Sequence, residues 1–125
     1  MILLDTHILV WWITNHKALG PNARRIVETA ETAHFSAASI FEIEIKKQKM
    51  YRMPEDLAKE FQRFGFSEVP ISASDAATIN SLDLARHDPF DQLLLAQAKN
   101  RDLRFITADS KILERGFDFV VDARA

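Results

Sequence analysis

Short apolar runs alternate along the chain with longer segments in which apolar residues recur every three to four positions. This alternation predicts β-strands separated by helices, an order that builds a parallel sheet with helices on both faces. The expected strands are 2–4, 33–36, 68–71, 103–107 and 119–121. Five helices are expected over 7–13, 39–49, 74–84, 89–100 and 110–115. A further helix is expected to begin at Gly20-Pro21, and another is expected to run from Pro54 until Gly65 ends it. Pro70 suits an edge strand, because proline cannot donate a backbone hydrogen bond.

Composition narrows the class of protein without naming a function. A chain of 125 residues suits one domain, and the longest apolar run, 8–13, is far shorter than the roughly 20 residues of a membrane helix. No signal peptide is expected at Met1, and the absence of cysteine excludes disulfides, thiolate zinc sites and cysteine nucleophiles. We therefore expect a cytoplasmic chain with no membrane partner. The net charge of −2 is not that of a dedicated nucleic-acid binder.

Four carboxylates occupy equivalent places in the expected fold. Asp5 follows the first strand and Asp109 follows the fourth, whereas Glu42 and Asp91 lie in the first turns of expected helices. In an open parallel sheet, the carboxyl ends of strands and the helix N-termini that follow them share one edge, where ligands bind. We therefore expect these four acids to converge.

Helix capping is the competing interpretation of each acid. The segment from Ser39 to Glu42 matches a capping box, and Asp88 matches an N-cap with Asp91 at the third helical position. Asp5 and Asp109 are also placed to cap the helices that follow them. Each cap stabilises a helix by about 1 kcal/mol. Capping gives no reason for four acids at one rim, where they would repel one another unless a cation lay among them.

Several carboxylates without thiolates favour a hard cation, Mg²⁺ or Mn²⁺. Such an ion polarises a phosphate, lowers the pKa of a water and neutralises charge on a leaving oxygen. A phosphodiester is the natural substrate for this chemistry.

Four segments together point to a family. The chain resembles the PIN-domain ribonucleases and, closely, the VapC-like toxins of toxin–antitoxin pairs. The segments stand in family order and span nearly the whole chain: Leu3 to His7 with Trp11 and Trp12, Ser36 to Ile43, His87 to Asp91, and Ile106 to Asp109.

The resemblance implies one three-layer α/β/α domain over residues 1–125, with a central parallel sheet of four to five strands. It implies an endoribonuclease that hydrolyses RNA with a metal-activated water, forms homodimers and is inhibited by a small antitoxin. The residues that it assigns to Mg²⁺ or Mn²⁺ are Asp5, Glu42, Asp91 and Asp109. Thr107 matches a supporting hydroxyl of the family, and Thr6 is expected to act likewise. Gln92 departs from the family pattern, because this branch usually has arginine there.

Further polar residues near the expected site have two interpretations each. Asp88 is expected to cap a helix rather than to bind metal, although it lies on nearly the same face as Asp91. A basic run could be a solvated helix end, a rim that guides RNA phosphates or an antitoxin contact, and Gln92 joins it as a possible contact residue. The run comprises Lys46, Lys47, Lys49 and Arg52.

Two other function classes remain as alternatives. A phosphatase-like phosphoryl-transfer enzyme of the haloacid-dehalogenase type needs a second Asp two residues after the first, and His7 stands there. A non-catalytic binding module with the same fold is expected to have lost at least one acid, and none is lost.

Overall fold

The computed structural model describes residues 1–50 and 53–125, and it describes side chains in these ranges except those of 48–50. Its sheet is parallel throughout, with strand order β3-β2-β1-β4-β5. The strands are β1 (Ile2–Leu4), β2 (Ala33–Ser36), β3 (Ser67–Val69), β4 (Arg104–Thr107) and β5 (Val120–Asp122). The predicted parallel sheet of four to five strands is therefore confirmed.

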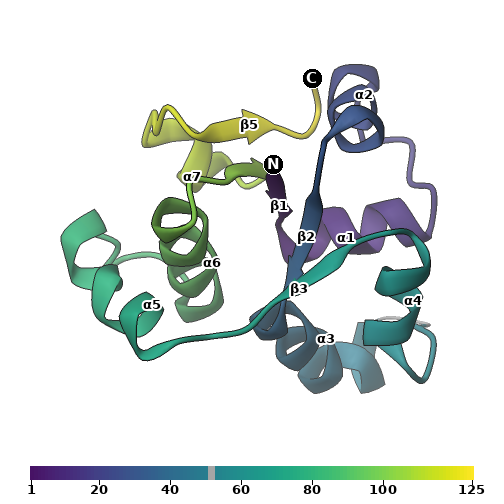
Figure 1. Cartoon of the computed structure of the whole chain (residues 1–125), viewed down its shortest axis with the longest axis horizontal. Helices are drawn as coiled ribbons and strands as arrows, with labels where there is room; N and C mark the ends of the chain where they lie inside the picture. The colour runs from purple at the N-terminus through teal and green to yellow at the C-terminus, as the bar shows by residue number, and fades with distance from the viewer. Residues whose placement is uncertain (51–52) are drawn as a thin grey trace.

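Helices cover both faces of this sheet. They are α1 (Thr6–Ile13), α2 (Pro21–Thr29), α3 (Ala37–Met50), α4 (Leu57–Arg63), α5 (Ala73–Thr78), the 3₁₀ turn η1 (Ile79–Leu82), α6 (Pro89–Asn100) and α7 (Ser110–Glu114). Figure 1 shows α1, α2 and α4 on one side of the strands, α5, α6 and α7 on the other, and α3 below the lower end of β2. This is the predicted three-layer α/β/α arrangement.

The first strand shows how the two hydrophobic cores arise. Ile2 and Leu4 belong to one core and Leu3 to the other, because successive side chains of a strand point to opposite faces. Phe35 packs against Phe61 in the first core, with ring centroids 5.2 Å apart. All three residues of β1 are buried, so the strand's carboxyl end lies deep in the molecule.

Several element boundaries differ from the prediction because local capping decides them. The helix expected from Pro54 begins instead at Leu57, where the Asp56 carboxylate accepts from the Lys59 amide at 3.1 Å. The helix expected over 74–84 consists of two parts, α5 followed by η1. It ends at Asp83, whose backbone is left-handed with a φ of 53°.

The third strand differs in extent but not in place. It spans Ser67–Val69 and ends before Pro70, so the proline needs no partner in the sheet. The strand lies at an edge of the sheet, as predicted.

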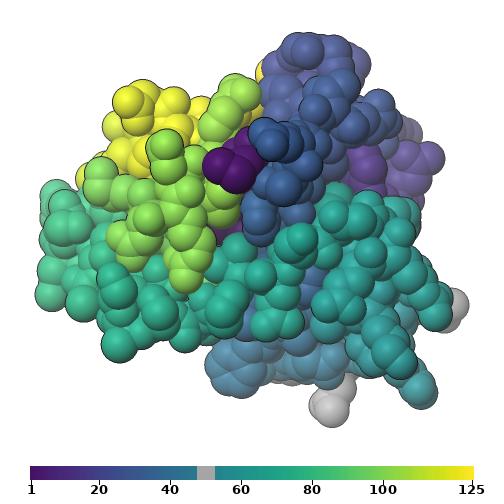
Figure 2. Space-filling model, viewed as in Figure 1, coloured from purple at the N-terminus to yellow at the C-terminus, as the bar shows by residue number. Residues whose placement is uncertain are grey.

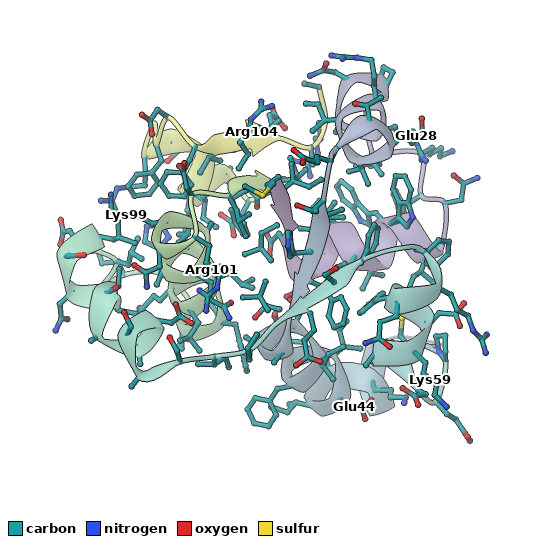
Figure 3. All side chains as sticks on the ribbon, in the orientation of Figure 1. Glu28, Glu44, Lys59, Lys99, Arg101 and Arg104 are labelled. Carbon is teal, nitrogen blue, oxygen red and sulfur yellow. The ribbon has the colours of Figure 1, made fainter. Side chains whose placement is uncertain are left out.

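Buried polar contacts fix α6 against the edge of the sheet. The Ser36 hydroxyl donates to Gln97 Oε1 at 2.6 Å, and Gln97 Nε2 donates to the Pro70 carbonyl at 3.2 Å. Arg101, labelled in Figure 3, donates to both oxygens of Asp75 at 2.7 and 3.0 Å. Burial disfavours the ionised Asp75, but the hydrogen bonds from Arg101, Ser72 and Asn100 together outweigh burial and hold the pKa of that carboxyl well below its usual range. These bonds fix the carboxyl-terminal half of α6 against β2, the segment after β3 and α5.

The amino ends of the strands form the edge opposite the acids. Figure 2 shows the purple start of the chain reaching the surface between blue residues near β2 and green residues near β4. The Arg104 amide donates to the Met1 carbonyl here at 3.1 Å. Among the described residues, no helix has the length and apolar character needed to span a membrane.

Candidate functional site

Two central strands bring Asp5 and Asp109 to the carboxyl edge of the sheet. Asp5 follows β1, and its amide donates to the Ile106 carbonyl of β4 at 3.0 Å. The Thr107 hydroxyl donates to Asp5 Oδ2 at 2.6 Å and accepts from the Asp109 amide at 3.1 Å. Thr107, buried at the end of β4, therefore holds the two acid-bearing segments together.

The same two acids cap helices, as the alternative interpretation predicted. Asp5 Oδ1 accepts from the Thr6 amide at 2.7 Å. Asp109 Oδ1 accepts from the amides of Lys111 and Ile112 at 2.8 and 3.2 Å. Capping and site placement are compatible, because each cap uses one carboxylate oxygen. Among the described contacts, Asp109 Oδ2 has no hydrogen-bond partner.

The two acids at the start of α6, Asp88 and Asp91, have different roles. Asp88 is the N-cap, and its Oδ1 accepts from the amides of Phe90 and Asp91 at 2.8 and 3.4 Å. Asp91 lies in the first turn, as predicted, and makes no capping bond there. Gln92 Nε2 donates to the His87 carbonyl at 2.8 Å, so this side chain holds the segment that precedes α6.

The fourth acid, Glu42, was placed incorrectly by the sequence pattern. Helix α3 begins at Ala37, directly after β2, so Glu42 lies in the second turn and the predicted capping box does not form. The reason is that Ser36 takes the capping role, with its hydroxyl accepting from the Ala38 amide at 3.0 Å. Ser39 is instead buried inside the helix, and its hydroxyl lies 2.8 Å from Thr6 Oγ1.

Glu42 carries an incompletely satisfied buried carboxylate. The residue is only 5% exposed. Its Oε2 accepts from Lys46 Nζ at 2.7 Å, whereas its Oε1 is buried with no hydrogen-bond partner among the described residues. An unsatisfied buried carboxylate oxygen is costly, so this atom marks a place for a donor or a cation that the chain itself does not supply.

The acids influence one another's protonation. Burial, with the charges of Asp5, Asp88, Asp109 and Glu42, raises the pKa of Asp91 to about 8. Burial also raises the pKa of Asp5 to about 6, although the hydrogen bonds from Thr107 and Thr6 lower it. Burial is the larger cause of both shifts, and the added effect of the neighbouring charges indicates that the acids lie close enough to repel.

The donor set fits a hard divalent cation. All four groups are carboxylates, the ligands that Mg²⁺ and Mn²⁺ prefer. The unpartnered oxygen of Glu42 and the negative charges that add to burial in raising the pKa of Asp91 both favour a cation among them. In the positions that they take here, no three acidic or histidine side chains of the described residues are arranged to hold one ion.

The predicted basic run is only partly described. Lys46 pairs with Glu42, and Lys47 Nζ lies 3.3 Å from Glu44 Oε1. The side chain of Lys49 and the whole of Arg52 lie outside the described residues. The two described lysines thus bind acids of their own helix.

A pocket of about 210 Å³ beside the acids contains residues that the sequence did not single out. This pocket, here called the Asp5–Arg124 pocket, is lined by Asp5, His7, Trp11, Ala108, Asp109 and Arg124. A second hollow of about 370 Å³ shares Asp109 and is lined by Arg86, His87, Asp88, Asp91, Asp109, Ser110 and Lys111. Arg124 stands in no recognisable motif, and only the folded position of the segment after β5 brings it to the acids.

A family model for the PIN domain matches residues 2–118 of the chain. Ribonuclease VapC22 of Mycobacterium tuberculosis (strain ATCC 25618 / H37Rv) is 28% identical over 115 residues, which cover 89% of this chain and 88% of that protein.

Solved structures share the fold at low identity. A toxin–antitoxin complex from Klebsiella pneumoniae contains a chain with a TM-score of 0.71 at 21% identity, over 98% of both chains. VapBC2 from Rickettsia felis, bound to a DNA fragment from its promoter, gives a TM-score of 0.68 at 18% identity, over 97% of this chain and 96% of that one.

Proposed function

The chain belongs to the PIN-domain family, and on that premise we propose that it is an endoribonuclease that depends on Mg²⁺ or Mn²⁺. The observation that carries the proposal is the convergence of four carboxylates at one edge of the sheet, with raised pKa values at Asp5 and Asp91. The similarity to a ribonuclease over most of both chains supports RNA as the substrate.

The proposed ligands of the ion are Asp5, Glu42, Asp91 and Asp109. When bound, the ion neutralises charge on the phosphate and lowers the pKa of a water that attacks phosphorus. The protein supplies orientation. The Thr6 amide and the Thr107 hydroxyl hold the two oxygens of Asp5, which fixes the orientation of that carboxylate. The start of α7 holds only Oδ1 of Asp109, so Asp109 Oδ2 is the oxygen that we propose for the ion. Asp91 makes no capping bond, so helix formation does not use its carboxylate.

The proposed reaction is hydrolysis. A water oxygen forms a bond to phosphorus while the bond from phosphorus to the 3′-oxygen breaks. The water gives one proton to solvent, and the 3′-oxygen takes one up. The products are a 5′-phosphate and a 3′-hydroxyl.

The proposal extends to the biological setting. Two structural neighbours were solved as toxin–antitoxin or VapBC complexes, which supports a toxin inhibited by a small antitoxin. Further parts of the proposal are a homodimer, one domain over residues 1–125 and a cytoplasmic location. Light scattering tests the dimer, and a monomer at every accessible concentration would contradict it.

The alternatives are less well supported. A non-catalytic binding module has no need for the unpartnered oxygen of Glu42 or the raised pKa of Asp91. A phosphatase of the haloacid-dehalogenase type lacks its second Asp, because His7 occupies that position and is exposed.

Cleavage of a fluorescently quenched single-stranded RNA tests the proposal. The chain should cut it with Mg²⁺ or Mn²⁺ and stop in excess EDTA. Asp91→Asn should abolish cleavage, because it removes a charged ligand without removing a cap. Asp88→Asn is the matched control: it removes a neighbouring charge, keeps an oxygen for the cap and should retain most of the activity. Full activity of Asp91→Asn, or in EDTA, would overturn the mechanism.

A further inference from the structure

Arg124 is a cation that lies beside Asp5 and Asp109 in a fixed position. Arg124 Nη1 donates to the Ala108 carbonyl at 2.8 Å, and its guanidinium carbon lies 5.5 Å from the centre of the Trp11 ring. Ala108 stands between Thr107 and Asp109, so the arginine is tied to the same strand end that carries the acids. Arg124, Asp5 and Asp109 all line the Asp5–Arg124 pocket.

The backbone around Arg124 is held as well. The amide of Gly20 donates to the Ala123 carbonyl at 2.8 Å, and the amide of Asn22 donates to the Ala125 oxygen at 3.0 Å. A Cβ at Gly20 would lie 2.5 Å from the backbone of Arg124 and Ala125, so only glycine permits this close approach. The arginine is therefore positioned before any ligand arrives, which reduces the entropy lost on binding.

The charge of Arg124 is not consumed by a carboxylate. Neither the Ala108 carbonyl nor the Trp11 ring carries a formal charge, and no ion pair of Arg124 occurs among the described residues. One N–H of its Nη1 is used, whereas Nε and Nη2 have no acceptor among the described contacts. A guanidinium offers five donors in a planar fork that matches two oxygens of a phosphate.

We propose that Arg124 binds a backbone phosphate of the RNA next to the phosphodiester that is cut, and that Trp11 positions its guanidinium. This inference rests on the proposed function. A polyanionic substrate meets net repulsion at four carboxylates, and a fixed arginine in the adjoining pocket gives the strand a point of attachment. It also sets which neighbouring phosphate lies beside the acids.

The competing role is a counter-charge that merely relieves repulsion among the acids. The two roles differ in a measurable way. A phosphate contact releases counterions from the nucleic acid. Each such contact therefore adds about 0.7 to the slope with which the logarithm of the RNA-binding constant falls against the logarithm of the salt concentration, for a single strand. A counter-charge changes the stability of the metal-free chain and leaves that slope unaltered.

The test compares the unaltered chain with Arg124→Gln, Arg124→Lys and Arg63→Gln, and with Trp11→Leu alone and in combination with Arg124→Gln. Arg63 is the matched control, an exposed arginine on α4 that pairs with a glutamate of its own helix. Anisotropy of a labelled single-stranded RNA in EDTA measures binding without cleavage, and a quenched RNA with Mn²⁺ measures kcat and KM.

Arg124→Gln should bind about tenfold or more weakly, with a salt slope smaller by about 0.7, and should raise KM more than it lowers kcat. Arg124→Lys should keep the slope and lose part of the affinity, because lysine has no planar fork. Arg63→Gln should change neither. In Trp11→Leu, binding should weaken in the same direction, and that effect should vanish when Arg124 is already Gln.

The outcomes separate this inference from the proposed function. Unchanged affinity and slope in Arg124→Gln, or an equal loss in Arg63→Gln, overturn the arginine's role even if the chain cleaves RNA. Binding through Arg124 without any cleavage supports its role and overturns the nuclease. A chain that neither binds nor cuts RNA overturns both.

Discussion

Among the four acids, Asp91 has the most strongly perturbed carboxyl. Its ordinary pKa is 3.8, and burial with neighbouring negative charge raises it to about 8. Asp88, three residues earlier, satisfies the helix start, so Asp91 gains no compensating hydrogen bond there. A buried carboxyl whose pKa is raised by burial and neighbouring charge is what the proposed function expects of a metal ligand.

This shift predicts how the stability of the metal-free chain depends on pH. Between pH 4 and 8 the folded chain keeps a proton that the unfolded chain has released, so the free energy of unfolding falls as pH rises. In EDTA, Asp91→Asn should match the unaltered chain near pH 4 and exceed it by roughly 1–3 kcal/mol at pH 8, a figure reduced for solvent screening. Urea unfolding at several pH values measures the difference.

Asp88→Asn is the control for this series, since it removes a charge from the same turn and should change the pH profile much less. Mn²⁺ should raise the melting temperature of the unaltered chain, and more at pH 8 than at pH 5, because ligands must lose protons to bind metal. A gap between Asp91→Asn and the unaltered chain that stays constant with pH would show that the raised pKa is wrong.

At the scale of elements, the junction of β1 and β4 aligns the site. The Thr107 hydroxyl is the link, because it donates to Asp5 and accepts from the Asp109 amide. The sequence predicted both strands and both acids here, since apolar runs that end in polar residues are visible without a structure. It also predicted a supporting role for Thr107, although only through the family resemblance.

Removing this hydroxyl should damage both stability and activity. In Thr107→Val the buried Asp5 Oδ2 loses its donor, which should cost roughly 1–3 kcal/mol of unfolding free energy. Cleavage should fall about tenfold or more, because a group that orients Asp5, a proposed metal ligand, is lost. Urea unfolding and RNA cleavage measure the two effects.

Thr107→Ser keeps the hydroxyl and should recover most of both properties. If the valine variant is as stable and as active as the unaltered chain, Thr107 does not hold Asp5 in the active arrangement.

Helix starts were harder to predict than strands. Glu42 was expected in a first turn because Ser39 to Glu42 matches a capping box, yet Ser36 caps α3 three residues earlier. The sequence cannot show this, because the choice between two serines depends on which one β2 delivers to the helix end. Glu42 nevertheless lies near the other acids, because its charge acts on both Asp5 and Asp91.

At the scale of the whole molecule, the site joins residues from both ends of the chain. The acids follow from one rule of parallel sheets, so the sequence predicted their shared edge. Arg124 could not be found that way. Its position depends on β5 pairing with β4 and on the close approach of the following segment to Gly20, neither of which has a local pattern.

Analysis of the cut ends by mass spectrometry tests most directly whether carboxylates, rather than histidines, carry the reaction. Histidine-based cleavage uses the neighbouring 2′-hydroxyl and leaves a 2′,3′-cyclic phosphate, with His7 and His87 as the histidines nearest the acids. We predict a 5′-phosphate and a 3′-hydroxyl, with slow cleavage retained at a single 2′-deoxy sugar and with Asp109→Asn inactive. A cyclic phosphate, with activity lost in His7→Ala or His87→Ala but kept in Asp109→Asn, would contradict the account.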